Sequence, residues 1–149
     1  MHETFADHWL TQGLPDDAKS ALYDIGDVVD VSPDDTIIEA DEPNQFMYLL
    51  LEGAYKVYLP KRPGRDHART LGHRGPGDLL GEYSFVDSFQ PTARVTASTP
   101  GLMFRVGHKM FRKWLDSDAD IGSIVYRNIL SYLVVRLRAQ DEELACLLF

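Results

Sequence analysis

The chain has almost no cysteine and no long apolar run. Its 149 residues contain one cysteine, Cys146, which excludes an internal disulfide framework and any four-cysteine iron–sulfur or zinc site. The longest nearly apolar stretch, within 129–137, is much shorter than a membrane-spanning helix and ends in arginines. The N-terminus also lacks the basic and then apolar pattern of a secretory signal. We therefore expect a cytoplasmic protein without a membrane partner.

Positive charge is scarce as well. Fifteen Lys and Arg residues face 23 Asp and Glu residues, which gives a net charge of −8. Nucleic-acid binding depends on neutralising phosphates, so an acidic domain is a poor partner for nucleic acid. Five basic residues nevertheless gather in what is predicted to be a long hairpin loop: Lys61, Arg62, Arg65, Arg69 and Arg74. We interpret them as solvated, with an acidic or phosphate-bearing partner as the alternative.

What the chain does contain indicates one globular domain, with 44% hydrophobic and 26% charged residues. Between residues 28 and 106, short alternating apolar runs are separated by Gly, Pro, Asp and Asn, which predicts an antiparallel sandwich or barrel. The pair Glu52–Gly53 lies between two of these runs and predicts a hairpin turn. We expect strands over 29–31, 36–40, 47–51, 54–59, 69–71, 93–98 and 102–106.

Helices are predicted on both sides of this segment. Residues 4–12 are expected to form a short helix, and a second helix begins at Pro15, because proline fits a first turn and the following acids suit the positive helix end. A further helix is expected over 107–115. Asp118 can then cap a long helix over about 119–147.

The long helix carries two apolar stripes. One has heptad-type spacing and predicts a homodimer interface: Tyr126, Leu130, Leu133, Leu137, Gln140, Leu144 and Leu147. The second runs through Ile121, Val125, Ile129 and Tyr132 and is expected to pack on the sheet. The apolar end of the chain, 144–149, would be costly to leave in water, which also favours a dimer.

One short stretch has the properties of a ligand site. Gly77–Asp78 leads into Leu80, Gly81, Glu82 and Tyr83, so that two glycines bracket a turn and an acid follows the second. Free backbone N–H groups in such a turn form a nest for an anionic or sugar-bearing ligand. The competing interpretation is that Glu82 only stabilises the positive end of a helix.

This stretch, together with residues 91–97, resembles the phosphate-binding cassette of cyclic nucleotide-binding domains. Residues 32–43 and 47–53 are similar to that family's first strand-and-turn and central hairpin, although Ala40 stands where the family usually has glycine. The resemblance implies a mainly β fold with flanking α: a jelly-roll-like antiparallel β-roll of about eight strands. We expect a single domain, 1–149, with N-terminal helices over 1–27, the β-roll over 28–106 and C-terminal helices over 107–149.

The resemblance also implies roles for particular residues. The glutamate corresponding to Glu82 hydrogen-bonds the ribose hydroxyl, and adjacent N–H groups meet phosphate oxygens. The arginine that grips the phosphate in the family is replaced by Pro91, which predicts weak binding of cyclic AMP or cyclic GMP. Arg94 is a less favoured substitute, because Val95 is expected to point inward on the same strand and Arg94 outward. The ligand-binding candidates are Leu80, Gly81, Glu82, Tyr83, Thr92 and Ala93, where Thr92 could offer a hydroxyl to phosphate.

We therefore expect a non-enzymatic regulatory module in signal transduction, in which a ligand repositions the C-terminal helices. It would use no cofactor, with a cyclic nucleotide or another nucleotide as the candidate ligand. Direct DNA binding is not expected, because the sequence is acidic and leaves no room for a helix-turn-helix domain after the long helix. The chain is either a stand-alone module or a piece of a larger protein.

Two other function classes stay open. One is a degenerate family member that works in dimerisation or protein interaction. The other is a cupin-like metalloenzyme, but His67 and His73 would lie about 20 Å apart on a strand, so we expect no metal site. The histidines, serines and Cys146 form no argued catalytic arrangement, and we expect no catalytic residues.

Overall fold

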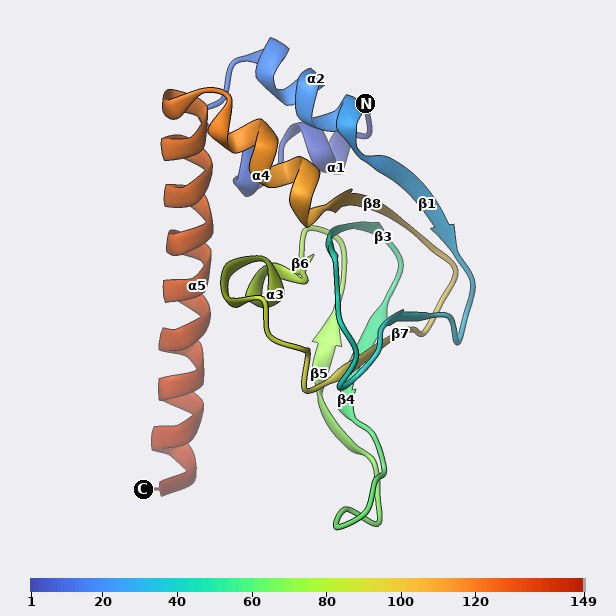
Figure 1. Cartoon of the computed structure of the whole chain (residues 1–149). Helices are drawn as coiled ribbons and strands as arrows, with labels where there is room; N and C mark the ends of the chain where they lie inside the picture. Colours follow the sequence, from blue (N-terminus) through green and yellow to red (C-terminus); the bar gives the residue numbers. More distant parts are fainter. Residues whose placement is uncertain (149) are drawn as a thin grey trace.

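Two four-stranded antiparallel sheets form the centre of the molecule (Figure 1). The computed structural model describes residues 1–148. The first sheet has the strand order β1-β8-β3-β6 and the second β2-β7-β4-β5. The strands are β1 (Asp27–Val31), β2 (Thr36–Ile38), β3 (Phe46–Glu52), β4 (Tyr55–Leu59), β5 (Arg69–Arg74), β6 (Leu79–Leu80), β7 (Arg94–Ala97) and β8 (Gly101–Gly107). The predicted roll of about eight antiparallel strands is confirmed.

The turn after β3 does not close a hairpin, so that prediction was wrong. β3 pairs with β8 and β6 in the first sheet, whereas β4 pairs with β5 and β7 in the second. Gly53 has a φ of +96°, and a Cβ there would lie 2.9 Å from the Pro100 carbonyl oxygen. The glycine thus lets the chain turn tightly from one sheet to the other.

β3 supplies side chains to both halves of the core. Met47, Leu49 and Leu51 pack toward the helices, whereas Tyr48 and Leu50 pack between the two sheets. Because successive strand residues point to opposite faces, a strand covered on both sides is apolar throughout. This explains the unbroken apolar run at 46–51.

The N-terminal segment is divided where the sequence predicted one helix. α1 (Glu3–Ala6) is followed by a short 3₁₀ helix, η1 (Trp9–Thr11), and then by α2 (Asp16–Ile25), which begins directly after Pro15. The division occurs at His8, whose Nδ1 accepts the Leu10 N–H at 3.0 Å. A side chain that caps a new turn competes with continuation of the preceding one.

The other helices are α3 (Glu82–Asp87), α4 (His108–Asp116) and α5 (Ala119–Leu148). Asp118 accepts the Asp120 and Ile121 N–H groups at 2.9 and 3.2 Å, as expected of a capping residue. The predicted bounds of the last two helices are confirmed to within one residue. No helix within residues 1–148 combines the length and the apolar character that a membrane crossing requires.

The first half of α5 is fastened to the body of the protein, and the rest runs along one side of the roll (Figure 1). Val125 and Ile129 are buried, and the Tyr132 ring stacks on Trp9 at 4.3 Å between centroids. Asn128 donates from Nδ2 to the Leu10 and Gln12 carbonyl oxygens, at 2.9 Å each. The stripe through Val125 and Ile129 is therefore buried, but it packs on the N-terminal segment and α4, whereas the sequence predicted packing on the sheet.

Gly122 allows α4 and α5 to approach closely. A Cβ at this buried position would lie 2.8 Å from the Leu115 carbonyl oxygen, which is backbone and cannot rotate away. We predict that Gly122→Ala destabilises the protein by about 1–2 kcal/mol despite the better helix propensity of alanine. Urea unfolding measures the change, with Ser123→Ala as the exposed neighbouring control. Equal or greater stability of Gly122→Ala would contradict the tight packing.

Candidate functional site

A cavity of about 520 Å³ lies between the second sheet, α3 and α5. All six predicted ligand-binding candidates line it: Leu80, Gly81, Glu82, Tyr83, Thr92 and Ala93. Pro91 lines it as well, as do apolar side chains of the strands such as Val57 and Leu71. The fold thus gathers the predicted residues from β6, α3 and the segment before β7 around one space.

Gly81 brings the chain against β3 at the start of α3. Its φ is +82°, and a Cβ there would collide with the Phe46 carbonyl oxygen and lie 2.8 Å from Asn44 Nδ2. From the other side, His108 Nε2 lies 3.1 Å from the Gly81 carbonyl oxygen. Only glycine combines this φ with such close backbone approach. Gly81 therefore fixes the position of the first turn of α3, from which Glu82 faces the cavity.

Glu82 is a buried carboxylate, with 3% of the residue exposed. Its Oε1 accepts from Arg136 Nη1 at 3.2 Å, across from α5. Burial raises the pKa of Glu82, while its own backbone N–H and the charges of Arg136 and Arg74 oppose that rise. The ion pair with Arg136 of α5 thus holds the Glu82 carboxylate at the cavity wall.

Sequence reasoning missed three residues that line this cavity: Arg74, Arg136 and Gln140. The sequence pattern assigned Gln140 only to the dimer seam, and it favoured a solvated loop for Arg74, with an acidic or phosphate-bearing partner as the alternative. A signal for Arg136 existed, because it lies seven residues after the buried Ile129 and four after Tyr132, which places it on the same helix face. Arg74 gave no such signal, since its strand was predicted to end at residue 71.

Pro91 contributes no hydrogen-bond donor to the cavity. Its carbonyl oxygen accepts the Asp41 N–H at 2.7 Å, and proline has no N–H of its own. Arg94 does not take over, because its Nε donates to Glu39 Oε1 at 2.6 Å and its Nη1 lies 3.4 Å from the Tyr58 hydroxyl. Val95 is buried on the opposite side of β7, as the alternation predicted.

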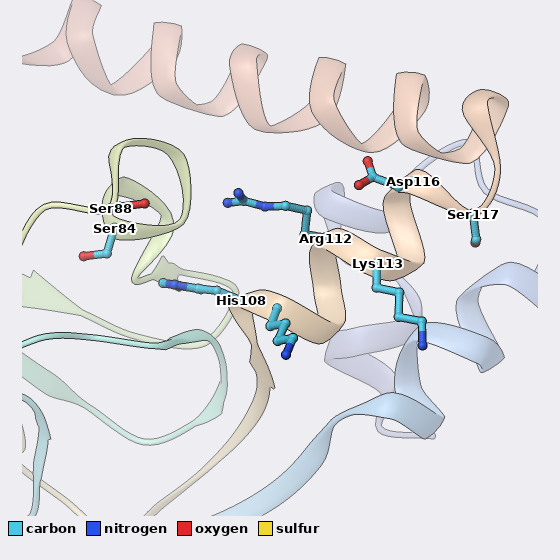
Figure 2. A pocket seen from close by; sticks show the side chains of 8 residues that line it. Ser84, Ser88, His108, Arg112, Lys113, Asp116 and Ser117 are labelled. Carbon is cyan, nitrogen blue, oxygen red and sulfur yellow. The ribbon is translucent and has the colours of Figure 1, made fainter.

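A larger and more open hollow of about 810 Å³ lies between α3 and α4 (Figure 2). His108 and Arg112 point from α4 toward the α3 segment, while Lys113 points away from it (Figure 2). Arg112 Nη2 donates to the Phe85 carbonyl oxygen at 2.7 Å. Burial lowers the pKa of His108, so the neutral ring donates to the Gly81 carbonyl oxygen. These groups contact α3 on the side away from the 520 Å³ cavity and hold it in place.

Apart from Arg74, the residues of the predicted basic hairpin lie outside the 520 Å³ cavity, and so do His67 and His73. Arg62 and Arg65 close the β4–β5 hairpin through paired backbone hydrogen bonds of 3.1 and 2.8 Å, and Arg62 also pairs with Asp41. His67 follows this tip and His73 lies on β5, both exposed. Among residues 1–148, no group of three or more His, Cys, Asp or Glu side chains is arranged to hold a metal ion.

The heptad residues of α5 are largely exposed. Leu130, Leu137 and Leu144 are 63, 58 and 56% exposed, whereas Leu133 is partly buried against the core. Tyr126 and Leu147 are exposed as well. Phe149, part of the predicted apolar end, lies outside the described residues. The seam is therefore an apolar surface along the side of α5.

Relatives were found by both sequence and structure. A curated "CRP-like cAMP-activated global transcriptional regulator" of Mycobacterium tuberculosis is 28% identical over 149 residues, which is the whole chain and 64% of that protein. The chain thus spans about 64% of its length. The crystal structure of the N-terminal domain of a transcriptional regulator from Streptomyces coelicolor matches with a TM-score of 0.73 and 25% identity, covering 96% of this chain and 95% of that one.

Two further solved structures share the fold. The Thermus thermophilus catabolite activator protein matches with a TM-score of 0.77 and 23% identity over 93% of this chain and 62% of its own. The regulatory subunit of a cAMP-independent protein kinase A from Trypanosoma brucei matches with a TM-score of 0.67 and 23% identity, over 88% of this chain and 48% of its own. The family model described as "Cyclic nucleotide-binding domain" matches residues 28–118. With that match over more than half of its length, the chain belongs to the cyclic nucleotide-binding domain family.

Proposed function

We propose that the chain is a non-enzymatic regulatory domain that binds a nucleotide, a cyclic mononucleotide in the first instance, in the cavity between the roll, α3 and α5. The observation that carries the proposal is Glu82, a buried carboxylate that faces the cavity from a turn shaped by Gly81. A carboxylate accepts hydrogen bonds from ribose hydroxyls. The curated relative, described as cAMP-activated, supports the same ligand class.

The cavity walls suit the rest of a nucleotide. Val57, Leu71 and Val95 offer apolar surface for a base or a sugar, and Gln140 adds an amide that can both donate and accept. Thr92 offers a hydroxyl to a phosphate. Because Pro91 offers no donor, we expect cyclic nucleotides to bind weakly.

Ligand binding would be coupled to α5 through the Glu82–Arg136 pair. A ribose hydroxyl that engages Glu82 changes the partner of Arg136, which belongs to the exposed second half of α5. A ligand shifts a conformational equilibrium only through contacts that differ between the states, and this pair is such a contact. Repositioning of α5 is therefore the proposed output.

The second candidate function is a degenerate module that works in dimerisation or protein interaction without a nucleotide. Pro91 is the observation that favours it, because a pocket without its phosphate arginine has lost a main source of affinity. The trypanosomal neighbour is itself described as cAMP-independent. Both candidates share one further proposal, that two copies associate through the exposed apolar seam of α5.

The first prediction separates these candidates. Pro91→Arg should strengthen binding of cyclic AMP or cyclic GMP by about thirtyfold or more, because a guanidinium adds two charge-assisted hydrogen bonds to the cyclic phosphate. Calorimetric titration of both proteins measures the change. Ser98→Arg adds the same charge at an exposed site outside the cavity and should leave affinity unchanged. Failure of both wild type and Pro91→Arg to bind any nucleotide would favour the degenerate module.

The second prediction concerns Arg136. Arg136→Met removes the cation that stabilises the buried Glu82 carboxylate, so the pKa of Glu82 rises further. Below that pKa the carboxyl group is neutral and little stability is lost. Above the pKa of Glu82, the folded variant must bury an unpaired negative charge. The decrease in the free energy of unfolding caused by Arg136→Met should therefore be larger at pH 8 than at pH 5, by about 1–2 kcal/mol.

Urea unfolding at the two pH values measures this difference. Arg138→Met, an exposed arginine on the same helix, is the control and should show no such pH dependence. Parallel pH profiles for wild type and Arg136→Met would show that the pair does not hold the charge of Glu82.

The third prediction tests the dimer. Leu137→Asp should convert a species of twice the chain mass into a monomer without unfolding the roll, because Leu137 is 58% exposed and contributes little to the core. Leu133 is a poorer site, since it packs partly against the core. Light scattering coupled to size exclusion measures the mass. A wild-type monomer at high micromolar concentration would rule out this interface.

A further inference from the structure

A second arginine faces the ligand cavity from β5. Arg74 is the last residue of that strand and lies directly opposite Tyr55 of β4. Residues directly opposite each other in an antiparallel pair project from the same face. Tyr55 is fully buried between the sheets, so Arg74 also starts from the inner face of the roll, and it lines the cavity.

Gly72 provides the space in which the Arg74 side chain lies. A Cβ at position 72 would be 3.1 Å from Arg74 Nη1, so the guanidinium folds back over the glycine along β5. Nη1 also donates to the neighbouring His73 carbonyl oxygen at 2.8 Å. These contacts hold the guanidinium over the strand that forms one wall of the cavity.

Arg74 is the cation of the cavity lining that forms no ion pair within residues 1–148. Four acidic or basic side chains line the space: Arg74, Glu82, Asp87 and Arg136. Glu82 pairs with Arg136, and the exposed Asp87 accepts the Phe89 N–H at 2.9 Å. Within residues 1–148, Arg74 has no carboxylate within ion-pair distance, although its charge is near enough to oppose the rise in the pKa of Glu82. The four charges sum to zero, but the guanidinium of Arg74 has no carboxylate partner and can therefore pair with an anion bound in the cavity.

We propose that Arg74 supplies the anion-binding guanidinium of this cavity and holds the phosphate of a monoanionic nucleotide from β5, instead of from position 91. This inference rests on the proposed nucleotide-binding function. A guanidinium binds a phosphate through two parallel charge-assisted hydrogen bonds, whichever strand carries it. The rest of the ligand would still meet Glu82 and the apolar walls.

The competing explanation for Arg74 is protection of a sheet edge. β5 is the last strand of the second sheet, and inward-pointing charges on edge strands discourage pairing with other chains. That role predicts a change in aggregation when Arg74 is replaced, but no change in which ligands bind. The two roles therefore differ in ligand preference.

The test compares ligands that differ only in phosphate. Wild type, Arg74→Gln and Arg69→Gln are titrated with cyclic AMP and adenosine, and with cyclic GMP and guanosine, by NMR chemical-shift perturbation, which also measures millimolar dissociation constants. Wild type should prefer each cyclic nucleotide over its nucleoside by about tenfold or more, and Arg74→Gln should lose this preference. Arg69 lies on the same strand but outside the cavity, so Arg69→Gln should keep it.

Gly72→Ala gives an independent arm. Apart from its chain neighbours, the added methyl group meets only the end of the Arg74 side chain within 4 Å, so the protein should stay folded while the phosphate preference falls. Arg74→Lys keeps the positive charge but loses the paired donors of the planar guanidinium, so it should keep part of the preference for nucleotide over nucleoside. Equal affinities of wild type for nucleotide and nucleoside, or an unchanged preference in Arg74→Gln, would overturn the role of Arg74 and leave the proposed function standing. Absence of any binding by both wild type and Pro91→Arg would overturn the proposed function itself.

Discussion

The buried carboxylate of Glu82 is the constraint on which the rest of the site depends. Only 3% of Glu82 is exposed, and burying a charged carboxylate costs free energy of folding unless a cation and hydrogen-bond donors lie beside it. The cation comes from Arg136, more than fifty residues later, and it opposes the rise that burial causes in the pKa of Glu82, so docking of α5 alongside α3 favours the ionised carboxylate. The position of a long helix and the charge state of the ligand cavity are therefore linked through one ion pair.

Three other contacts hold the surrounding backbone where this pair needs it. His8 Nε2 donates to the Gly77 carbonyl oxygen at 2.6 Å, and burial lowers the pKa of its ring, which keeps it neutral. From α4, His108 and Arg112 donate to carbonyl oxygens at the start and within α3. Elements before and after the roll thus converge on the same short stretch, 77–85. These hydrogen bonds add to the apolar cluster in which the N-terminal and C-terminal helices pack together.

The sequence predicted the roll and its flanking helices well because alternation and capping are local signals. The predictions failed where a distant partner decides the outcome. β3 pairs with β8 instead of with its neighbour β4, and the buried ring of His8 divides the first helix. At the site, Gly81, Glu82 and Pro91 were found from the motif. Arg74 was missed because only its cross-strand partner, the buried Tyr55, shows that it points inward.

The stacking of Trp9 on Tyr132 gives the chain an optical reporter of its own. The chain has two tryptophans. The Trp9 indole stacks on Tyr132 of α5, which lies one turn before Arg136, whereas Trp114 stacks on Phe111 within α4. Movement of α5 away from the roll would separate the first indole from Tyr132, whereas the second would keep its stack on Phe111 within α4. The fluorescence of Trp9 therefore registers whether the long helix is docked, without any attached dye.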